Sequence, residues 1–361
     1  MSYNDKDFSV FNGKKLRVEI FGASHSKEIG VRVDGLEKFA IDFDKLEEFM
    51  DRRRAKNTAY STKRIESDQV IINSGVDGET LNSTRFEAVI QNNNQRSSDY
   101  AKTNKIPRPA HADFVAWSKY GDEFDYRGGG KFSGRLTAPM CIIGGICKQI
   151  LEDKGISINA YIQSIGKENG KSYNDVDVES FDFSKISKEF PLLDEEYKSK
   201  MLDEIEDARN NLDSVGGKIE CVVKGIPVGV GEYMFDSIEG TISLLAFSVP
   251  AVKGIEFGRG FDIAKMRGSS ANDSFYYDGD KVKTKTNNNG GINGGISNGM
   301  PITFRVAVKP TPSIAKEQDT IDLESKKNVK LKIEGRHDAC IVPRAVPVIE
   351  AITAIAIYDM M

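Results

Sequence analysis

The chain has only three histidines, and all three lie where catalytic side chains are often found. His25 follows a strand-like run, His111 precedes an expected helix, and His337 opens another. Strand ends and helix starts are favoured places for catalytic groups and bound anions. Histidine titrates near neutral pH, so two of them beside a departing phosphate could give or shuttle protons. A single histidine is more often a structural donor or a surface residue, but three placed alike favour chemistry.

Asp338, next to His337, is a candidate base for the same chemistry. Its alternative role is the N-cap of the helix that follows, because aspartate is common at such junctions.

Arginines gather around the histidines. Guanidinium groups bind phosphate and carboxylate through paired hydrogen bonds, so this set suits a ligand with several anionic groups. Arg52, Arg53 and Arg54 close an expected helix, where a basic run could also simply complement the helix dipole. The other arginines lie in or beside the histidine-bearing and glycine-rich segments: Arg108, Arg127, Arg135, Arg336 and Arg344.

Two glycine-rich segments could approach a ligand closely. The first, 128–130, precedes an expected helix, and the free amides of a helix start bind phosphate. It has neither P-loop nor dinucleotide-binding spacing, so alone it is a weak signal. The second has four glycines within 290–295 and is followed by the segment 309–313.

Composition limits the classes of partner. The 361 residues include 54 acidic and 50 basic side chains, a formal charge of −4, so no whole-chain positive field attracts nucleic acid or an anionic membrane. Four scattered cysteines without metal or disulfide spacing indicate reduced, packed thiols in a cytoplasmic protein without a bound metal. The polar, acidic N-terminus does not resemble a secretory signal.

The elements that must position these residues mix strands and helices without a regular alternation, which predicts an α+β fold. β-branched runs predict strands at 16–21, 69–73, 86–91, 218–224 and 302–308. Apolar periodicity predicts helices at 44–54, 133–154 and 195–212. The apolar stretch 339–357 contains Pro343, Arg344, Pro347 and Glu350, which indicates a buried C-terminal helix and not a bilayer span. The polar stretch around 166–212 is expected to be a surface insertion.

Taken in order, the motifs resemble the chorismate synthase family over nearly the whole chain. Residues 22–35 resemble the family's first signature around its Ser-His, 108–113 its Arg-Pro-x-His-Ala-Asp element, and 127–135 its Arg-Gly-Gly-Gly segment. Residues 213–217, 251–258, 290–299, 309–313 and 336–350 continue the resemblance in the same order.

The resemblance implies a single α+β domain over residues 1–361, a β-α-β sandwich that assembles as a homotetramer. It implies a lyase that removes phosphate from 5-enolpyruvylshikimate 3-phosphate by trans 1,4-elimination and gives chorismate. It also implies that reduced FMN is required, without net redox change. NADPH is implied only if the protein reduces its own flavin; otherwise a separate flavin reductase is needed.

Roles follow by matched position. His25 resembles the histidine that protonates the departing phosphate, His111 the one that stabilises reduced flavin, and Asp338 the residue that works with flavin N5 to remove the ring proton; His337 is supportive. The substrate set is Arg53, Arg108, Arg135 and Arg344. The flavin set is Lys131, Phe132, Ser133, Pro250, Ala251, Gly294, Lys309, Pro310, Thr311, Pro312, Ser313 and Arg336.

Several positions depart from the family pattern. Ala23 stands where a glutamate is usual, Ser26 where a glycine is usual, and Ala59 where an arginine is usual. Phe132 replaces a small hydroxyl residue, and Pro250 replaces an asparagine. Two alternatives therefore stay open: a ligand-binding relative that has lost turnover, and a flavin-assisted lyase that acts on another anionic substrate.

Overall fold

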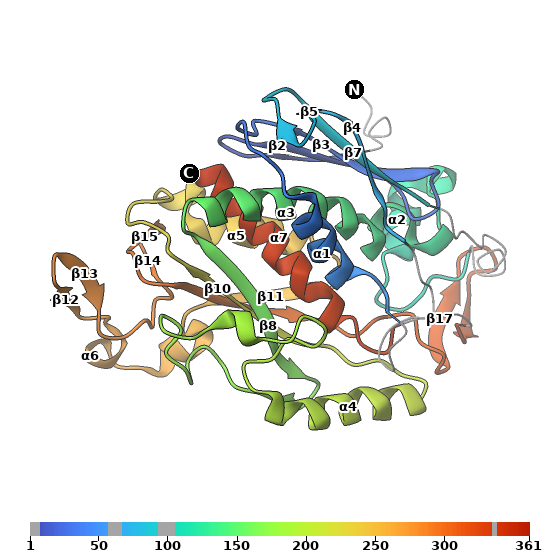
Figure 1. Cartoon of the computed structure of the whole chain (residues 1–361). Coiled ribbons are helices and arrows are strands. Elements are labelled where there is room, and N and C mark those ends of the chain that lie inside the picture. Colours follow the sequence, from blue (N-terminus) through green and yellow to red (C-terminus); the bar gives the residue numbers. More distant parts are fainter. Residues whose placement is uncertain (1–7, 57–66, 93–104, 334–337) are drawn as a thin grey trace.

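The computed structural model, which describes residues 8–56, 67–92, 105–333 and 338–361, has helices between two antiparallel sheets (Figure 1). The first sheet has the strand order β1-β2-β3-β7-β4. Val18 and Ile20 face the core, whereas Glu19 on the opposite face accepts hydrogen bonds from Arg17 and Arg32. The strands are β1 (Phe8–Asn12), β2 (Arg17–Gly22), β3 (Glu28–Asp34), β7 (Phe86–Gln91) and β4 (Val70–Ser74).

The second sheet has the strand order β11-β16-β10-β8-β9, and its central strand is buried on both faces. In its central strand, Ile219, Cys221 and Val223 join the main core, while Val222 packs on the other face with Tyr161 and Tyr173. The strands are β11 (Val252–Phe257), β16 (Ile302–Val308), β10 (Gly217–Lys224), β8 (Ser157–Ile165) and β9 (Glu168–Asn169).

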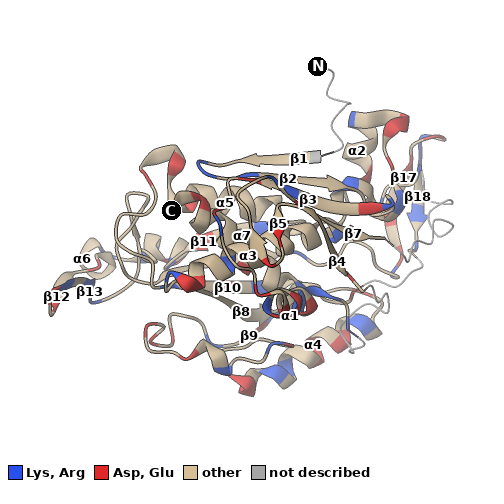
Figure 2. Ribbon diagram, turned by 45° about the horizontal axis from the view of Figure 1, so that its top comes forward, with Lys and Arg blue, Asp and Glu red and all other residues tan. Residues whose placement is uncertain are grey.

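The segment around 166–212, expected to be a surface insertion, covers that second face. Its Tyr173 and Val178 are buried on that face, whereas its helix α4 (Lys198–Asn210) buries Met201 and Ile205 in the main core cluster. The exposed side of α4 has both acidic and basic residues (Figure 2). The segment thus has a polar exterior and an apolar interior.

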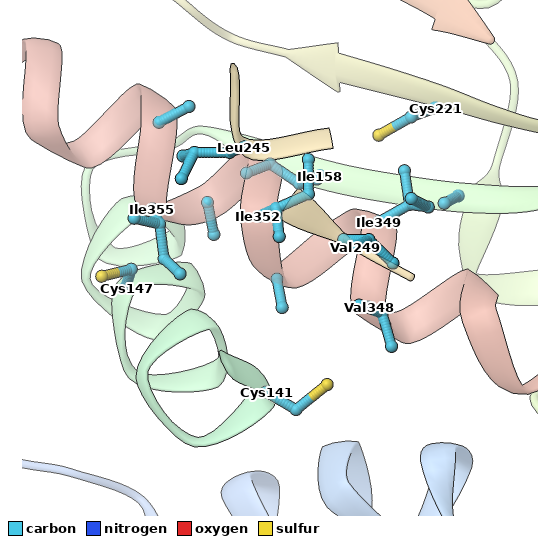
Figure 3. Packing of buried hydrophobic residues seen from close by; sticks show 14 of the residues in the cluster. Cys141, Cys147, Ile158, Cys221, Leu245, Val249, Val348, Ile349, Ile352 and Ile355 are labelled. Carbon is cyan, nitrogen blue, oxygen red and sulfur yellow. The ribbon is translucent and has the colours of Figure 1, made fainter. Parts of the chain in front are cut away.

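Four helices fill the space between the sheets: α1 (Phe43–Arg53), α3 (Thr137–Asp153), α5 (Ile238–Ser248) and α7 (Val342–Met360). Helices α3 and α7 touch closely, since a Cβ on Gly144 would lie 2.3 Å from the Cβ of Ala351. Figure 3 shows Ile349, Ile352 and Ile355 of α7 among side chains of the surrounding elements. The buried C-terminal helix is therefore confirmed.

Two helix starts were predicted too early. The helix predicted at 195–212 begins at Lys198, because residues Glu195–Tyr197 form a 3₁₀ turn. The pattern predicted a helix from residue 133, but α3 begins at Thr137, because residues Gly134–Leu136 form a 3₁₀ turn. The Ser133 hydroxyl caps that turn by accepting a hydrogen bond from the Arg135 amide at 3.3 Å.

Shorter hairpins and helices lie outside the two large sheets. Lone hairpins occur at β5 (Val76–Asp77) with β6 (Thr80–Leu81), β12 (Phe275–Asp278) with β13 (Lys281–Thr284), β14 (Ile292–Asn293) with β15 (Ile296–Ser297), and β17 (Gln318–Asp322) with β18 (Lys327–Leu331). The remaining helices are α2 (Asp113–Tyr120) and α6 (Gly268–Ala271). Within the described ranges, no helix is both long and apolar enough to span a membrane. The α+β class and the β-α-β sandwich are as predicted.

Candidate functional site

The first glycine-rich loop lies between two histidines. Residues Gly128, Gly129 and Gly130 have φ values of 60°, 90° and 55°, a left-handed conformation that favours glycine. A Cβ on Gly128 would lie 2.5 Å from Cε1 of His25, and a Cβ on Gly129 would lie 3.2 Å from Nε2 of His111. The loop therefore brings together two histidines that are 86 positions apart in the sequence.

His25 is buried in a tight turn after β2, with 5% of its surface exposed. The amide of Ser24 donates to the Gly130 carbonyl at 3.1 Å. The hydroxyl of Ser26 contacts the Glu28 carbonyl at 2.5 Å and the Ala23 carbonyl at 2.8 Å. Ser26 thus closes the turn that presents His25.

A buried cluster of charged and polar side chains contacts this turn. Asn92 donates to the Ser26 carbonyl at 2.8 Å and accepts from Nε of Arg135 at 3.1 Å. Arg135 also donates to Asp68, which accepts from Arg53 at 2.9 Å. Burial lowers the pKa of Arg53 to about 10 despite its partner Asp68, so the guanidinium stays charged at neutral pH.

Arg53 is bound on all sides by the protein itself. Its Nε donates to the Thr137 hydroxyl at 2.8 Å, and its Nη2 donates to the Gly134 carbonyl at 3.1 Å. The residue is 4% exposed. These contacts give Arg53 a structural role, and substrate binding by Arg53 stays a prediction.

Asp338 approaches the same cluster from the other end of the chain. It accepts a hydrogen bond from Nη1 of Arg344 at 2.7 Å, and Nε of Arg344 donates to the Arg53 carbonyl at 3.1 Å. Helix α7 begins at Val342, and its N-cap is Ile341. The alternative role of Asp338 as the N-cap is therefore wrong.

His111 belongs to a second charged group. Its Nδ1 lies 2.7 Å from Oδ1 of Asp113, which also accepts from Nη2 of Arg108 at 2.8 Å. Arg108 further donates from Nε to Asp113 at 2.7 Å and from Nη1 to the Ser313 hydroxyl at 3.2 Å. Burial raises the pKa of Asp113, but the hydrogen bonds from Arg108 and His111 outweigh it and hold that pKa well below its usual range.

The segment 309–313 packs beside this group. Nζ of Lys309 donates to the Ala110 carbonyl at 2.5 Å, and the Lys309 amide donates to the Ala251 carbonyl at 2.9 Å. Ala251 has a left-handed φ of 76° and follows Pro250. The Thr311 carbonyl accepts from the Ser214 hydroxyl at 2.7 Å. Pro310 and Pro312 flank Thr311 in this same segment.

These contacts, together with neighbouring positions in the chain, link the residues of the candidate site into a closed ring, the site circuit. Most residues expected from the sequence for catalysis, substrate or flavin belong to it or adjoin it. In order, the circuit runs His25, Gly128, Gly129, His111, Asp113, Arg108, Ser313, Thr311, Ser214, Val215, Ala339, Asp338, Arg344, Arg53, Asp68, Arg135, Asn92 and back to the turn of His25.

Some expected residues lie apart from the circuit. Gly294 lies in the turn between β14 and β15, which Figure 1 places at the opposite end of the molecule from α2. Phe132 packs against Tyr120 and Phe124, with ring centroids at 6.5 and 6.1 Å. Lys131 is exposed. Arg336, His337 and Ala59 lie outside the described residues.

Sequence reasoning did not single out Asp68, Asn92 or the partnership of Asp113 with His111. Asp68 and Asn92 lie outside every motif, so no signal marked them. Asp113 ends the 108–113 motif, and its spacing from His111 was the available clue. In the described part of the chain, no group of His, Cys, Asp and Glu side chains could hold a metal ion.

The chain is similar to known proteins over nearly its whole length. The family model for chorismate synthase matches residues 16–361. The chain is 42% identical to the chorismate synthase of Dehalococcoides mccartyi strain BAV1 over 349 residues, 96% of this chain and 95% of that protein. It is 43% identical to the enzyme of Methanocaldococcus jannaschii, covering 97% of this chain and 95% of the relative.

A crystal structure of a chorismate synthase superposes with a TM-score of 0.76 at 26% identity, covering 97% of this chain and 92% of that one. The chain belongs to the chorismate synthase family.

Proposed function

We propose that the protein is an active chorismate synthase, a lyase that eliminates phosphate from 5-enolpyruvylshikimate 3-phosphate to give chorismate. The observation that carries this proposal is the contact of one glycine-rich loop with both His25 and His111. Two imidazoles, which can give or accept protons, then flank one short backbone segment in which a Cβ on Gly128 or Gly129 would lie 2.5 or 3.2 Å from a ring. The whole chain acts as one domain, since one core cluster includes residues of both sheets and of the helices between them.

The roles of the side chains follow from the bonds that change. A C–O bond to phosphate breaks and a ring C–H bond loses its proton, so one group must protonate the leaving phosphate and another must accept the ring proton. His25 gives the first proton, and Asp338 accepts the second. His111 exchanges its proton through Nε2, the ring nitrogen that lies next to Gly129.

Reduced FMN fits the residues that the resemblance assigns to it. The hydroxyl oxygen of Thr311 is buried and lacks a hydrogen-bond partner among the described residues, which marks a place for a ligand acceptor. Lys309 begins the same segment, and its burial, followed by the charge of Lys253, lowers its pKa. Lys309, Thr311 and Ser313 would hold the cofactor. When bound, reduced FMN supplies an electron-rich ring beside the substrate and is not consumed.

The assembly is a homotetramer in the cytoplasm. Exposed large hydrophobic side chains concentrate between residues 228 and 282, including Phe235 at 95% and Phe261 at 82% exposure, and such surfaces commonly form subunit contacts. The four cysteines are buried and free, as in reducing compartments. Light scattering of the purified protein tests the tetramer.

The source of the reduced flavin is a separate question. Measuring NADPH oxidation with added FMN distinguishes intrinsic flavin reduction from dependence on a separate reductase.

The decisive experiment is anaerobic phosphate release from 5-enolpyruvylshikimate 3-phosphate, with and without chemically reduced FMN. We expect release only with the reduced flavin, accompanied by stoichiometric chorismate. A folded protein that binds FMN but leaves this ester intact would be a lyase for another anion. A folded protein that neither binds FMN nor releases phosphate would be a non-catalytic relative.

A further inference from the structure

Asp113 stands at the first turn of α2 but turns its carboxylate back to the loop that carries His111. Its two oxygens accept four hydrogen bonds from only two residues. The Arg108 amide donates at 3.0 Å, its Nε at 2.7 Å and its Nη2 at 2.8 Å, and His111 Nδ1 lies at 2.7 Å. All three side chains are between 11% and 15% exposed. The group is therefore partly shielded from water, where such bonds are strong.

The contacts determine which nitrogen of His111 carries the proton. Arg108 forms a bidentate pair with Asp113, which keeps the carboxylate ionised and without a proton of its own. A carboxylate oxygen 2.7 Å from an unprotonated nitrogen would place two lone pairs against each other, so Nδ1 must carry the hydrogen. Nη2 of Arg108, 3.1 Å from Nδ1, then donates to Asp113 and not to the ring.

The second ring nitrogen of His111, Nε2, is consequently the one available for proton exchange. With the hydrogen on Nδ1, neutral His111 has an unprotonated Nε2, and this atom lies against Gly129. Arg108, in turn, has each of its three nitrogens engaged, two with Asp113 and one with Ser313. Its guanidinium is therefore committed to the protein.

We propose that Asp113 is a positioning residue: it fixes the Nδ1–H tautomer of His111 so that Nε2 exchanges the proton, and Arg108 acts through Asp113 instead of binding substrate. The catalytic consequence rests on the proposed function, whereas the tautomer can be measured without any turnover.

The first test is the tautomer itself. The chain has three histidines, so long-range ¹H–¹⁵N spectra of protein labelled with ¹⁵N-histidine contain three ring patterns, and His111→Gln identifies that of His111. We expect the Nδ1–H form for neutral His111. In Asp113→Asn the side-chain amide can donate to Nδ1, so the Nε2–H form should become populated. An Nε2–H pattern in the unaltered protein would overturn the proposal, whatever the variants do.

The second test separates positioning from binding. Asp113→Asn should lower kcat about 100-fold, as expected when general acid–base geometry is lost, with KM changed by less than about threefold because no substrate contact is removed. The pH profile of kcat should shift. Arg108→Gln should also lower kcat, and the double variant should be no worse than the poorer single variant. A raised KM with normal kcat in Arg108→Gln would show that Arg108 binds substrate.

Asp34→Asn is the matched control, because Asp34 also forms a bidentate pair with an arginine, Arg85, at 2.9 and 2.8 Å, on the outer face of the first sheet. It should leave the His111 pattern and kcat unchanged. If the enzyme proved inactive on 5-enolpyruvylshikimate 3-phosphate, the spectra would still decide the role of Asp113. If Asp113→Asn kept both the tautomer and a kcat within about twofold of normal, Asp113 would have no positioning role.

Discussion

The two glycine-rich segments look alike in sequence and differ in what their missing side chains face. At 128 and 129 a Cβ would meet the imidazoles of His25 and His111. At Gly290 and Gly295 a Cβ would meet backbone atoms, namely the Gly258 amide at 2.6 Å and the Glu232 carbonyl at 2.4 Å. Both segments have left-handed glycines, so backbone conformation does not separate them.

The difference shows that the role of a glycine cluster depends on which atoms surround it in the fold. In the first loop, the imidazoles of His25 and His111 occupy the space of a Cβ at Gly128 and Gly129, whereas the Asp125 carbonyl occupies it at Gly130. The second loop is glycine-rich because strands and turns pack against it. A Cβ on Gly290, for example, would lie 2.7 Å from the Thr303 carbonyl oxygen. Substitutions in the first loop should therefore affect turnover, and those in the second should affect stability.

The largest effect is expected for Gly128→Ala. The new methyl would lie 2.5 Å from Cε1 of His25, in a residue with φ of 60°, so the imidazole must move. We expect kcat to fall about 100-fold or more, because a shift of this size misplaces a catalytic group. The measurement is kcat beside a thermal melt. Gly279→Ala, at φ of 62° with nothing within 4 Å, controls for backbone strain alone. Equal losses in both variants would break the comparison.

Gly290→Ala should give the next largest effect, on stability. Its Cβ would clash with two backbone atoms in an element that cannot move aside easily, so we expect about 2 kcal/mol of destabilisation. Denaturant unfolding measures this loss, and turnover per folded molecule should stay normal. A variant with unchanged stability and reduced turnover would place this second loop in the active site.

Much of the fold was predictable, because alternation and β-branched residues mark half-buried strands. The strands at 86–91 and 302–308 were predicted with the observed bounds. The start of α3 was missed, because residues 134–136 suit a helix locally but take a 3₁₀ turn. Local pattern cannot distinguish these two ways of starting a helix.

The candidate site was predictable only where its residues share a motif. The histidines stood out because three rare residues occupied similar junctions. Arg53 and Arg108 also stood out, yet the structure pairs them with Asp68 and Asp113. Asp68 is 15 residues from Arg53 and lies outside every motif, so only the tertiary fold reveals that this arginine already has a partner. Counting arginines therefore overestimates the groups available to a substrate.

Gly129→Ala should have a smaller effect than Gly128→Ala. Its Cβ would lie 3.2 Å from Cε1 and Nε2 of His111, so a shift of a few tenths of an ångström relieves the contact. Because Asp113 holds the other side of the ring, we still expect kcat to fall about tenfold, within the range of acid–base contributions. The pH profile of kcat should change as well. A loss greater than that of Gly128→Ala would make His111 the more sensitive of the two histidines.

The smallest effect is expected for Gly294→Ala, which tests the second loop where it is least crowded. Gly294 has φ of 62° and nothing within 4 Å of a Cβ, so the cost should be the strain of a left-handed alanine, about 1 kcal/mol. Turnover and FMN affinity should stay normal if the residue only turns the β14–β15 hairpin. Weaker FMN binding in a fully folded variant would instead mean that this hairpin reaches a flavin. Since Figure 1 places the hairpin far from α2 within one chain, that flavin would belong to another subunit. Mixing inactive His25→Ala subunits with the Gly294 variant would then restore activity, because each would supply the part that the other lacks.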